Sequence, residues 1–215
     1  MIIDFTAELV NGLIGVEDST EAPQKLWKVI FDKKKREKLF HDFLQIEHDL
    51  SYDWFQSYFE DVQADRKKDK QDFTPNAISD IILGIQGVNS DHQYFEPAVG
   101  TGGMMIRRWD RDRQDMGFFN YKPSMFFYRV EDRSNTAMPF LLFNCLIRGM
   151  NITIFWGDSL ERTCKDVFFI QNDEDNSMGF SNINVMPRTE EVKKEFNVSK
   201  WLGEHNNHIE STLKL

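Results

Sequence analysis

The stretch FEPAVGTGG, Phe95 to Gly103, holds an acid, a proline and three glycines, and the apolar residues Met104, Met105 and Ile106 follow it directly. Inside regular secondary structure each glycine costs about 0.5–1 kcal/mol relative to alanine. The cluster therefore indicates a tight turn, a ligand that approaches the backbone closely, or both. The flanking apolar residues predict a strand before this turn and a helix after it.

A strand–turn–helix element offers a ligand bare backbone at the turn and unpaired N–H groups at the start of the helix, which attract a negative charge. The pyrophosphate signatures GxGxxG and GxxxxGK[ST] are absent, because Met105 stands where the third glycine of the first would be and no Gly-Lys-Ser/Thr occurs. Dinucleotides and ATP are therefore poor candidates. An acid before the turn and a second acid ending the next strand suit a ligand with a ribose and a carboxylate but no phosphates, such as S-adenosylmethionine.

The chain has 215 residues and a mass of 25.4 kDa, which suits one main core with a smaller appendage. Its 19 phenylalanines indicate an interior packed with aromatic rings. No apolar run approaches the roughly 20 residues that a membrane span needs, and the start MIIDFTAELV lacks the features of a secretory signal. We therefore expect a cytoplasmic protein with no membrane partner.

The formal net charge of −9 argues against a free-standing, high-affinity nucleic-acid binder, because neutralising phosphates requires a positive surface. The two cysteines, Cys145 and Cys164, lack the spacing of metal ligands. We expect both to be reduced, partly buried thiols, with no disulfide and no metal site.

Apolar residues between about 21 and 64 recur at three- and four-residue intervals, which predicts two or three helices. The charged link from Ala64 to Asp72 is expected to be a hinge or an exposed loop. Thr74 and Pro75 then fit the cap and the first turn of a helix over about 76–85.

From Tyr94 onward, short apolar runs alternate with turn signals and an amphipathic segment, which predicts a parallel sheet with crossover connections. The expected strands cover 93–96, 124–130, 152–156 and 166–170, and the expected helices cover 137–148 and one or two short segments after about 189, TEEVKKEF and SKWLGEH.

FEPAVGTGG resembles the first signature of the N6-adenine DNA methyltransferases, most closely that of the modification subunits of type I restriction systems, whose usual form is Asp-Pro-x-x-Gly-Thr-Gly-Gly. Three further elements stand in the family's order. QDFTP, residues 71–75, is similar to the Gln/Glu-Phe-(Tyr)-Thr-Pro element of the family, in which the tyrosine is optional. YRVED, residues 128–132, is similar to its second strand, and WGDSL, residues 156–160, to the end of its third.

The resemblance implies a site for S-adenosylmethionine. Glu96, in place of the usual aspartate, would contact the amino group of the cofactor, Glu131 would bind the ribose hydroxyls, and Asp158 would bind the adenine amino group. QDFTP would lie beside the methionine end. The cofactor residues that the resemblance implies are Phe73, Thr74, Pro75, Glu96, Pro97, Gly100, Thr101, Gly102, Glu131 and Asp158.

The fold expected from the resemblance is the three-layer α/β, Rossmann-like fold of S-adenosylmethionine-dependent methyltransferases, with a reduced sheet. Residues 1–70 would form a helical N-terminal region, and residues 71–215 a methyltransferase-like α/β domain that is truncated on its C-terminal side.

The catalytic half departs from the family. Its members carry Asn/Asp-Pro-Pro-Tyr/Phe after the fourth strand, which holds and stacks a flipped adenine. Here Asn172 stands at the asparagine position, and Asp173, Glu174 and Asp175 replace the prolines and the aromatic ring. Asn172 is the candidate catalytic residue; a displaced loop at SNINVMP, with Asn182 or Asn184, fits the spacing less well.

Three functions follow. The first is an S-adenosylmethionine-dependent DNA adenine-N6 methyltransferase-like protein, with a partner protein that supplies DNA specificity. The second is a catalytically inactive methyltransferase-fold binding module, phage or plasmid borne, that acts through a protein partner. The third is a methyltransferase whose substrate is not a base.

Overall fold

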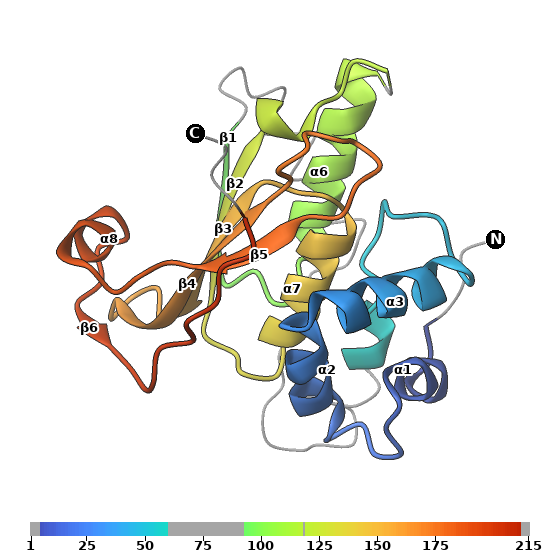
Figure 1. The fold of residues 1–215 in the computed structure, drawn as a ribbon, viewed down its shortest axis with the longest axis horizontal. Coiled ribbons are helices and arrows are strands. Elements are labelled where there is room, and N and C mark those ends of the chain that lie inside the picture. The colour runs from blue at the N-terminus through green and yellow to red at the C-terminus, as the bar shows by residue number, and fades with distance from the viewer. Residues whose placement is uncertain (1–4, 60–92, 118, 212–215) are drawn as a thin grey trace. The chain divides into compact units, whose positions relative to one another are not determined.

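The computed structural model describes residues 5–59, 93–117 and 119–211 (Figure 1). The expected helix over 76–85 and the QDFTP residues Phe73, Thr74 and Pro75 lie outside these ranges. The chain divides into two compact units. Of the described residues, unit 1 comprises 5–59, 100–111 and 135–144, and unit 2 comprises 93–99, 112–117, 119–134 and 145–211.

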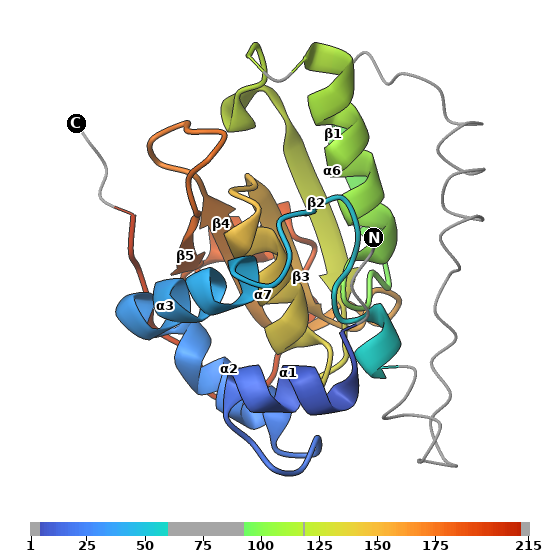
Figure 2. The same ribbon diagram turned by 90° about the vertical axis from the view of Figure 1, so that its right-hand side faces the viewer.

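Unit 1 contains three N-terminal helices, α1 (Ala7–Ile14), α2 (Ala22–Ile30) and α3 (Lys33–Leu44), which Figure 2 shows together. The hydroxyl of Thr6 caps α1 by accepting from the Leu9 N–H at 3.3 Å, and the Asp32 carboxylate caps α3 by accepting from the Lys35 N–H at 3.2 Å. α2 and α3 are two of the two or three helices that were expected between about 21 and 64. α1 precedes that range and falls within the N-terminal region that was expected to be helical.

Aromatic rings form the core of unit 1. Phe5, Phe43 and Trp54 stack on one another, with ring centroids 5.2–6.0 Å apart. Phe143 packs against Phe43 at 4.8 Å and against Phe55 at 5.1 Å. All five rings are buried, so the phenylalanine-rich composition is explained here by packing.

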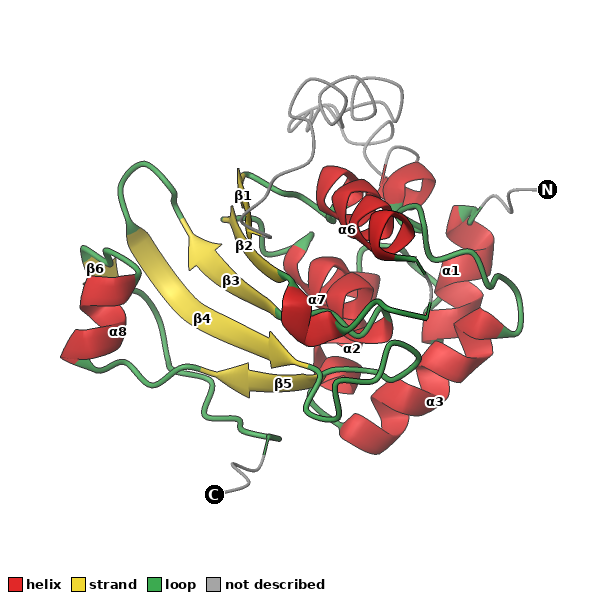
Figure 3. Ribbon diagram, turned by 90° about the horizontal axis from the view of Figure 1, so that it is seen from above, coloured by secondary structure: helices red, strands yellow, loops and turns green. Residues whose placement is uncertain are grey.

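Unit 2 is built on a mixed sheet in the order β1-β2-β3-β4-β5 (Figure 3). The strands β1 (Gln93–Pro97), β2 (Phe127–Asp132) and β3 (Ile152–Gly157) are parallel, and a short 3₁₀ helix, η1 (Pro123–Met125), precedes β2. The fold is thus a mixed α/β arrangement.

Two long helices carry the chain between strands. They are α6 (Gly103–Met116), which begins at the last glycine of the FEPAVGTGG stretch, and α7 (Met138–Ile147). Gly149, with a left-handed φ of 64°, follows α7 and ends it as expected.

The fourth strand was expected to be parallel to the others, and this expectation was wrong. β4 (Thr163–Gln171) pairs antiparallel with β3. Only residues 158–162 connect the two strands, whereas a parallel crossover needs a dozen or more residues. The short connection therefore makes a hairpin.

After β4 the chain forms two further strands that were not expected from the sequence. β5 (Asn182–Val185) pairs antiparallel with β4, and β6 (Lys200–Trp201) pairs parallel with it. The short helix α8 (Glu190–Glu195) agrees with the expectation for TEEVKKEF. SKWLGEH was wrongly expected to be a helix, because pairing with β4 draws its first residues into the sheet.

Cys145 and Cys164, both in unit 2, are buried free thiols. Burial raises the pKa of both, that of Cys164 to about 12. Among the helices in the described ranges, none has the length and apolar content that crossing a bilayer requires.

We expect Phe143→Ala to lower the free energy of unfolding by about 3–5 kcal/mol, because it removes a ring from the centre of a close-packed cluster. Met178→Ala is the matched control, since Met178 is 73% exposed, and should change stability by less than about 0.5 kcal/mol. Chemical denaturation of both variants measures this. Equal stabilities would contradict the assignment of the aromatic cluster as the core of unit 1.

Candidate functional site

The glycine turn in unit 1 adopts a conformation that needs glycine. Gly100 and Gly102 have φ values of 61° and 105°, in the left-handed region that side chains disfavour. A Cβ on Gly102 would also stand 2.9 Å from Met105 Cε and 3.2 Å from Leu141 Cδ1. Gly103 has open space around its Cα and begins α6. The turn thus requires glycine at residue 102 but not at residue 103.

Thr101, between these glycines, is only 1% exposed. Its hydroxyl donates to the Asp53 carboxylate at 2.5 Å, and its carbonyl accepts from Asn144 Nδ2 at 2.8 Å. The side chain of Thr101 is therefore engaged inside unit 1.

In unit 2 the end of β1 lies beside the end of β2. Pro97 pairs with Glu131, and the Val99 N–H donates to the Glu131 carbonyl at 3.0 Å. Glu96 is 8% exposed, and its carboxylate accepts from the Tyr94 hydroxyl at 2.8 Å. The chain thus leaves β1 next to Glu131 just before the glycines begin.

Glu131 is a buried acid with one oxygen engaged. Its side chain is 2% exposed, and Oε2 pairs with Arg162 Nη1 at 2.5 Å. Among the described residues no hydrogen bond is donated to Oε1. The Arg162 guanidinium also donates to the Phe196 carbonyl at 2.6 Å and lies over the Phe155 ring, 4.2 Å from its centroid. Arg162 is therefore fixed on several sides and holds the Glu131 carboxylate in place.

Asp158 follows β3 at the same edge of the sheet as Glu131. Its carboxylate accepts from the N–H groups of Leu160 and Glu161, each at 2.9 Å, and lies 3.5 Å from Arg133. The backbone hydrogen bonds are the main cause that lowers the pKa of Asp158 below its usual value. The side chain thus shapes the tight connection between β3 and β4.

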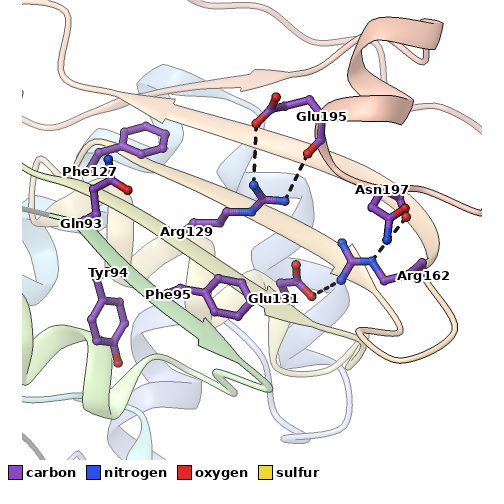
Figure 4. A pocket seen from close by; sticks show the side chains of 9 residues that line it. All are labelled: Gln93, Tyr94, Phe95, Phe127, Arg129, Glu131, Arg162, Glu195 and Asn197. Atoms are coloured by element: carbon purple, nitrogen blue, oxygen red, sulfur yellow. Dashed lines mark hydrogen bonds and ion pairs between the residues drawn. The ribbon is translucent and has the colours of Figure 1, made fainter. Parts of the chain in front are cut away.

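A cavity of about 820 Å³ lies on one face of β1 and β2 in unit 2. Figure 4 shows Glu131 between Phe95, Arg129 and Arg162 in this cavity. Phe95 and Phe127 are 57% and 41% exposed along it, and Arg129 lies 3.8 Å from the Glu195 carboxylate. The residues that line the cavity are Gln93, Tyr94, Phe95, Phe127, Arg129, Glu131, Arg162, Glu195 and Asn197.

Sequence reasoning assigned no role to Arg162 or Glu195. The alternation of residues along β1 and β2 could have placed Phe95, Arg129 and Glu131 on one face. Arg162 offered no such signal, because its pairing with Glu131 depends on the direction of β4.

Asn172 lies elsewhere in unit 2. It follows the last residue of β4, and its N–H donates to Asn151 Oδ1 at 2.8 Å, beside the start of β3. Its Nδ2 donates to the carbonyls of Gly149 and Asn176, and its Oδ1 accepts from the Asn176 N–H. Because β4 is antiparallel to β3, Asn172 follows the end of β4 that lies beside the start of β3. Glu131 and Asp158 lie at the opposite ends of the strands. The structure does not bring these residues together.

The acids after Asn172 form hydrogen bonds with other residues of unit 2. Asp175 accepts from the N–H and hydroxyl of Ser124, and Asp173 accepts from Asn182 Nδ2 and from the Ser211 hydroxyl. SNINVMP is not the displaced loop that was considered, because Asn182 and Asn184 lie on β5; Asn184 accepts from the N–H groups of Glu210 and Ser211. Within the described ranges, no group of three or more His, Cys, Asp or Glu side chains is arranged to hold a metal ion.

A glycine turn follows the first of three parallel strands, and acids stand at the ends of the next two, so this mixed α/β arrangement is consistent with a methyltransferase-like fold. A family model described as N-6 DNA Methylase matches residues 48–197, and the chain belongs to this family.

Two curated relatives come from Methanocaldococcus jannaschii. The type I restriction enzyme MjaVIII methylase subunit is 25% identical over 173 residues, which cover 74% of this chain and 27% of the relative. The type I restriction enzyme MjaVII methylase subunit is 28% identical over 163 residues, 71% of this chain and 25% of the relative. The chain thus spans about a quarter of the length of these relatives. No solved structure matches the chain significantly.

We expect Gly102→Ala to lower the free energy of unfolding by about 1–3 kcal/mol, because it forces a side chain into the left-handed region and against Met105. Gly103→Ala, its neighbour in the same motif, should stay within about 0.5 kcal/mol of the natural protein. Thermal and chemical denaturation of the pair would test this, and equal losses would show that the turn has another conformation in solution.

Proposed function

We propose that this chain binds S-adenosylmethionine at the carboxyl ends of β1, β2 and β3 and is a DNA adenine-N6 methyltransferase-like protein. The observation that carries the proposal is the register that sets Pro97 and Val99, at the exit of β1, against Glu131, at the end of β2. Ligands of open α/β sheets bind beyond the carboxyl ends of parallel strands. Gly100 and Gly102 follow directly in the chain.

The residues present fit this cofactor. Glu131 Oε1 accepts no hydrogen bond among the described residues, so it can accept one from a ribose hydroxyl while Oε2 stays paired with Arg162. Arg162 would then orient the carboxylate. The glycine turn would let the backbone approach the cofactor closely, and Asp158 would face its adenine. When bound, the cofactor supplies an electrophilic methyl group.

The names of the two relatives support the proposal that this chain works with a partner protein. Each is the methylase subunit of a type I restriction enzyme, and each is about four times as long as the matched region. We propose that DNA specificity, and the contacts that hold a flipped adenine, come from a partner protein rather than from this chain alone. The net charge of −9 also disfavours binding of DNA by the chain alone.

A second candidate is a catalytically inactive binding module of the same fold. The position of Asn172 favours it, because both its amide oxygen and its amide nitrogen are used by backbone partners at the edge of the sheet opposite Glu131. Such a module would bind the cofactor and act through a protein partner without transferring a methyl group.

We expect the protein to bind S-adenosylmethionine and Glu131→Gln to weaken binding about tenfold or more, since it replaces a charged acceptor of a ribose hydroxyl with a neutral one. Glu190→Gln is the control: it removes an exposed acid of unit 2 that does not line the cavity, and it should leave affinity unchanged. Isothermal titration calorimetry measures all three. Absence of binding to the natural protein would overturn the proposal.

Transfer of a labelled methyl group to DNA separates the two candidates. The methyltransferase predicts incorporation into adenine, at least when a specificity subunit is added, with Asn172→Ala having no direct effect because Asn172 lies away from Glu131. Cofactor binding without transfer under either condition would support the inactive module.

A further inference from the structure

A buried polar cluster in unit 1 joins three distant parts of the chain. Asp53, Thr101 and Asn144 are 6%, 1% and 0% exposed. Asp53 Oδ2 accepts from the Thr101 hydroxyl at 2.5 Å, and Asp53 Oδ1 accepts from Asn144 Nδ2 at 2.8 Å. Asn144 Nδ2 also donates to the Thr101 carbonyl at 2.8 Å. We call these three residues the Asp53 cluster.

The Asp53 cluster is a strong restraint because its acid is buried. A buried carboxylate is tolerated only when hydrogen bonds replace water, and hydrogen bonds to a charged group are about twice as strong as neutral ones. Thr101 is held at both its hydroxyl and its carbonyl, so its side chain and its backbone are fixed together.

Thr101 is flanked by two glycines, the residue type with the greatest backbone freedom. It lies between Gly100 and Gly102, which both have a left-handed backbone conformation. Because glycine has no side chain, neither residue can hold the turn in place through contacts of its own. A turn of this kind needs an outside contact to fix it. The Asp53 cluster provides that contact from within unit 1.

Asp53 is itself anchored. Its Oδ1 also accepts from the Phe55 N–H at 3.0 Å. Trp54 and Phe55, the two residues after it, are buried in the aromatic core, where Phe55 packs on Phe140 at 4.8 Å and on Phe143 at 5.1 Å. Asn144 directly follows Phe143 on α7. Two members of the cluster are thus tied to the same packed rings.

We infer that Asp53 is a positioning residue for the cofactor turn. Through Thr101 and with Asn144 it sets the conformation of residues 100–103, although it is not expected to touch the cofactor itself. The inference rests on the proposed binding of S-adenosylmethionine. It links the segment before residue 60 to the glycine turn within unit 1.

The test compares Asp53→Ala with Asp112→Ala. Asp112 is the matched control, because it is also a buried acid, 7% exposed, that accepts from a hydroxyl, that of Tyr128, at 2.7 Å. Asp53→Ala should weaken binding of S-adenosylmethionine about 10- to 100-fold, by analogy with the loss of an outer-shell partner that orients a metal ligand. Asp112→Ala should lose similar stability and keep its affinity, and Asp53→Asn, which retains an acceptor for Asn144, should recover part of the loss.

Hydrogen exchange gives a readout without the cofactor. The amides of residues 101–103 should exchange faster in Asp53→Ala than in the natural protein, and at the natural rate in Asp112→Ala after correction for global stability. Natural affinity in a folded Asp53→Ala protein would overturn the inference. If the natural protein binds no cofactor, the proposed function fails, and unchanged exchange at residues 101–103 in Asp53→Ala would then overturn the positioning role as well.

Discussion

The parallel pairing of β1 with β2 is the constraint on which the candidate site depends. Its register sets Pro97 opposite Glu131 and lets the Val99 N–H bond the Glu131 carbonyl, so the chain leaves β1 beside a buried acid. Side chains alternate between the two faces of a sheet, so a shift of one residue would turn Glu131 away from its cavity. Arg162, from the β3–β4 connection, then fixes the carboxylate.

Much of the local structure could be predicted from the sequence, because it depends on residues close in the chain. The glycines of the turn, the strand expected over 152–156 and observed over 152–157, and the stop at Gly149 all follow from local composition. The contacts of the Asp53 cluster could not be predicted in this way. They join residues 48 and 91 positions apart, and no periodicity links such positions.

Reversal of a single strand accounts for the main difference from the expected architecture. The order of motifs along the chain suggests that Asn172 ends a strand parallel to the others, beside the cofactor. Because only residues 158–162 connect β3 to β4, the strand runs back, and its end arrives beside Asn151 at the start of β3. Motif order thus gave the family correctly, while the length of one connection decided where the asparagine lies.

The burial of both thiols has a practical consequence. A thiol whose pKa is raised by burial is almost entirely protonated at neutral pH, and only the thiolate reacts with alkylating reagents. Cys145 and Cys164 both belong to unit 2, so their rate of alkylation reports the opening of that unit. The alkylation of the two native cysteines can therefore be used to follow the unfolding of unit 2, on α7 and on β4, without an introduced label.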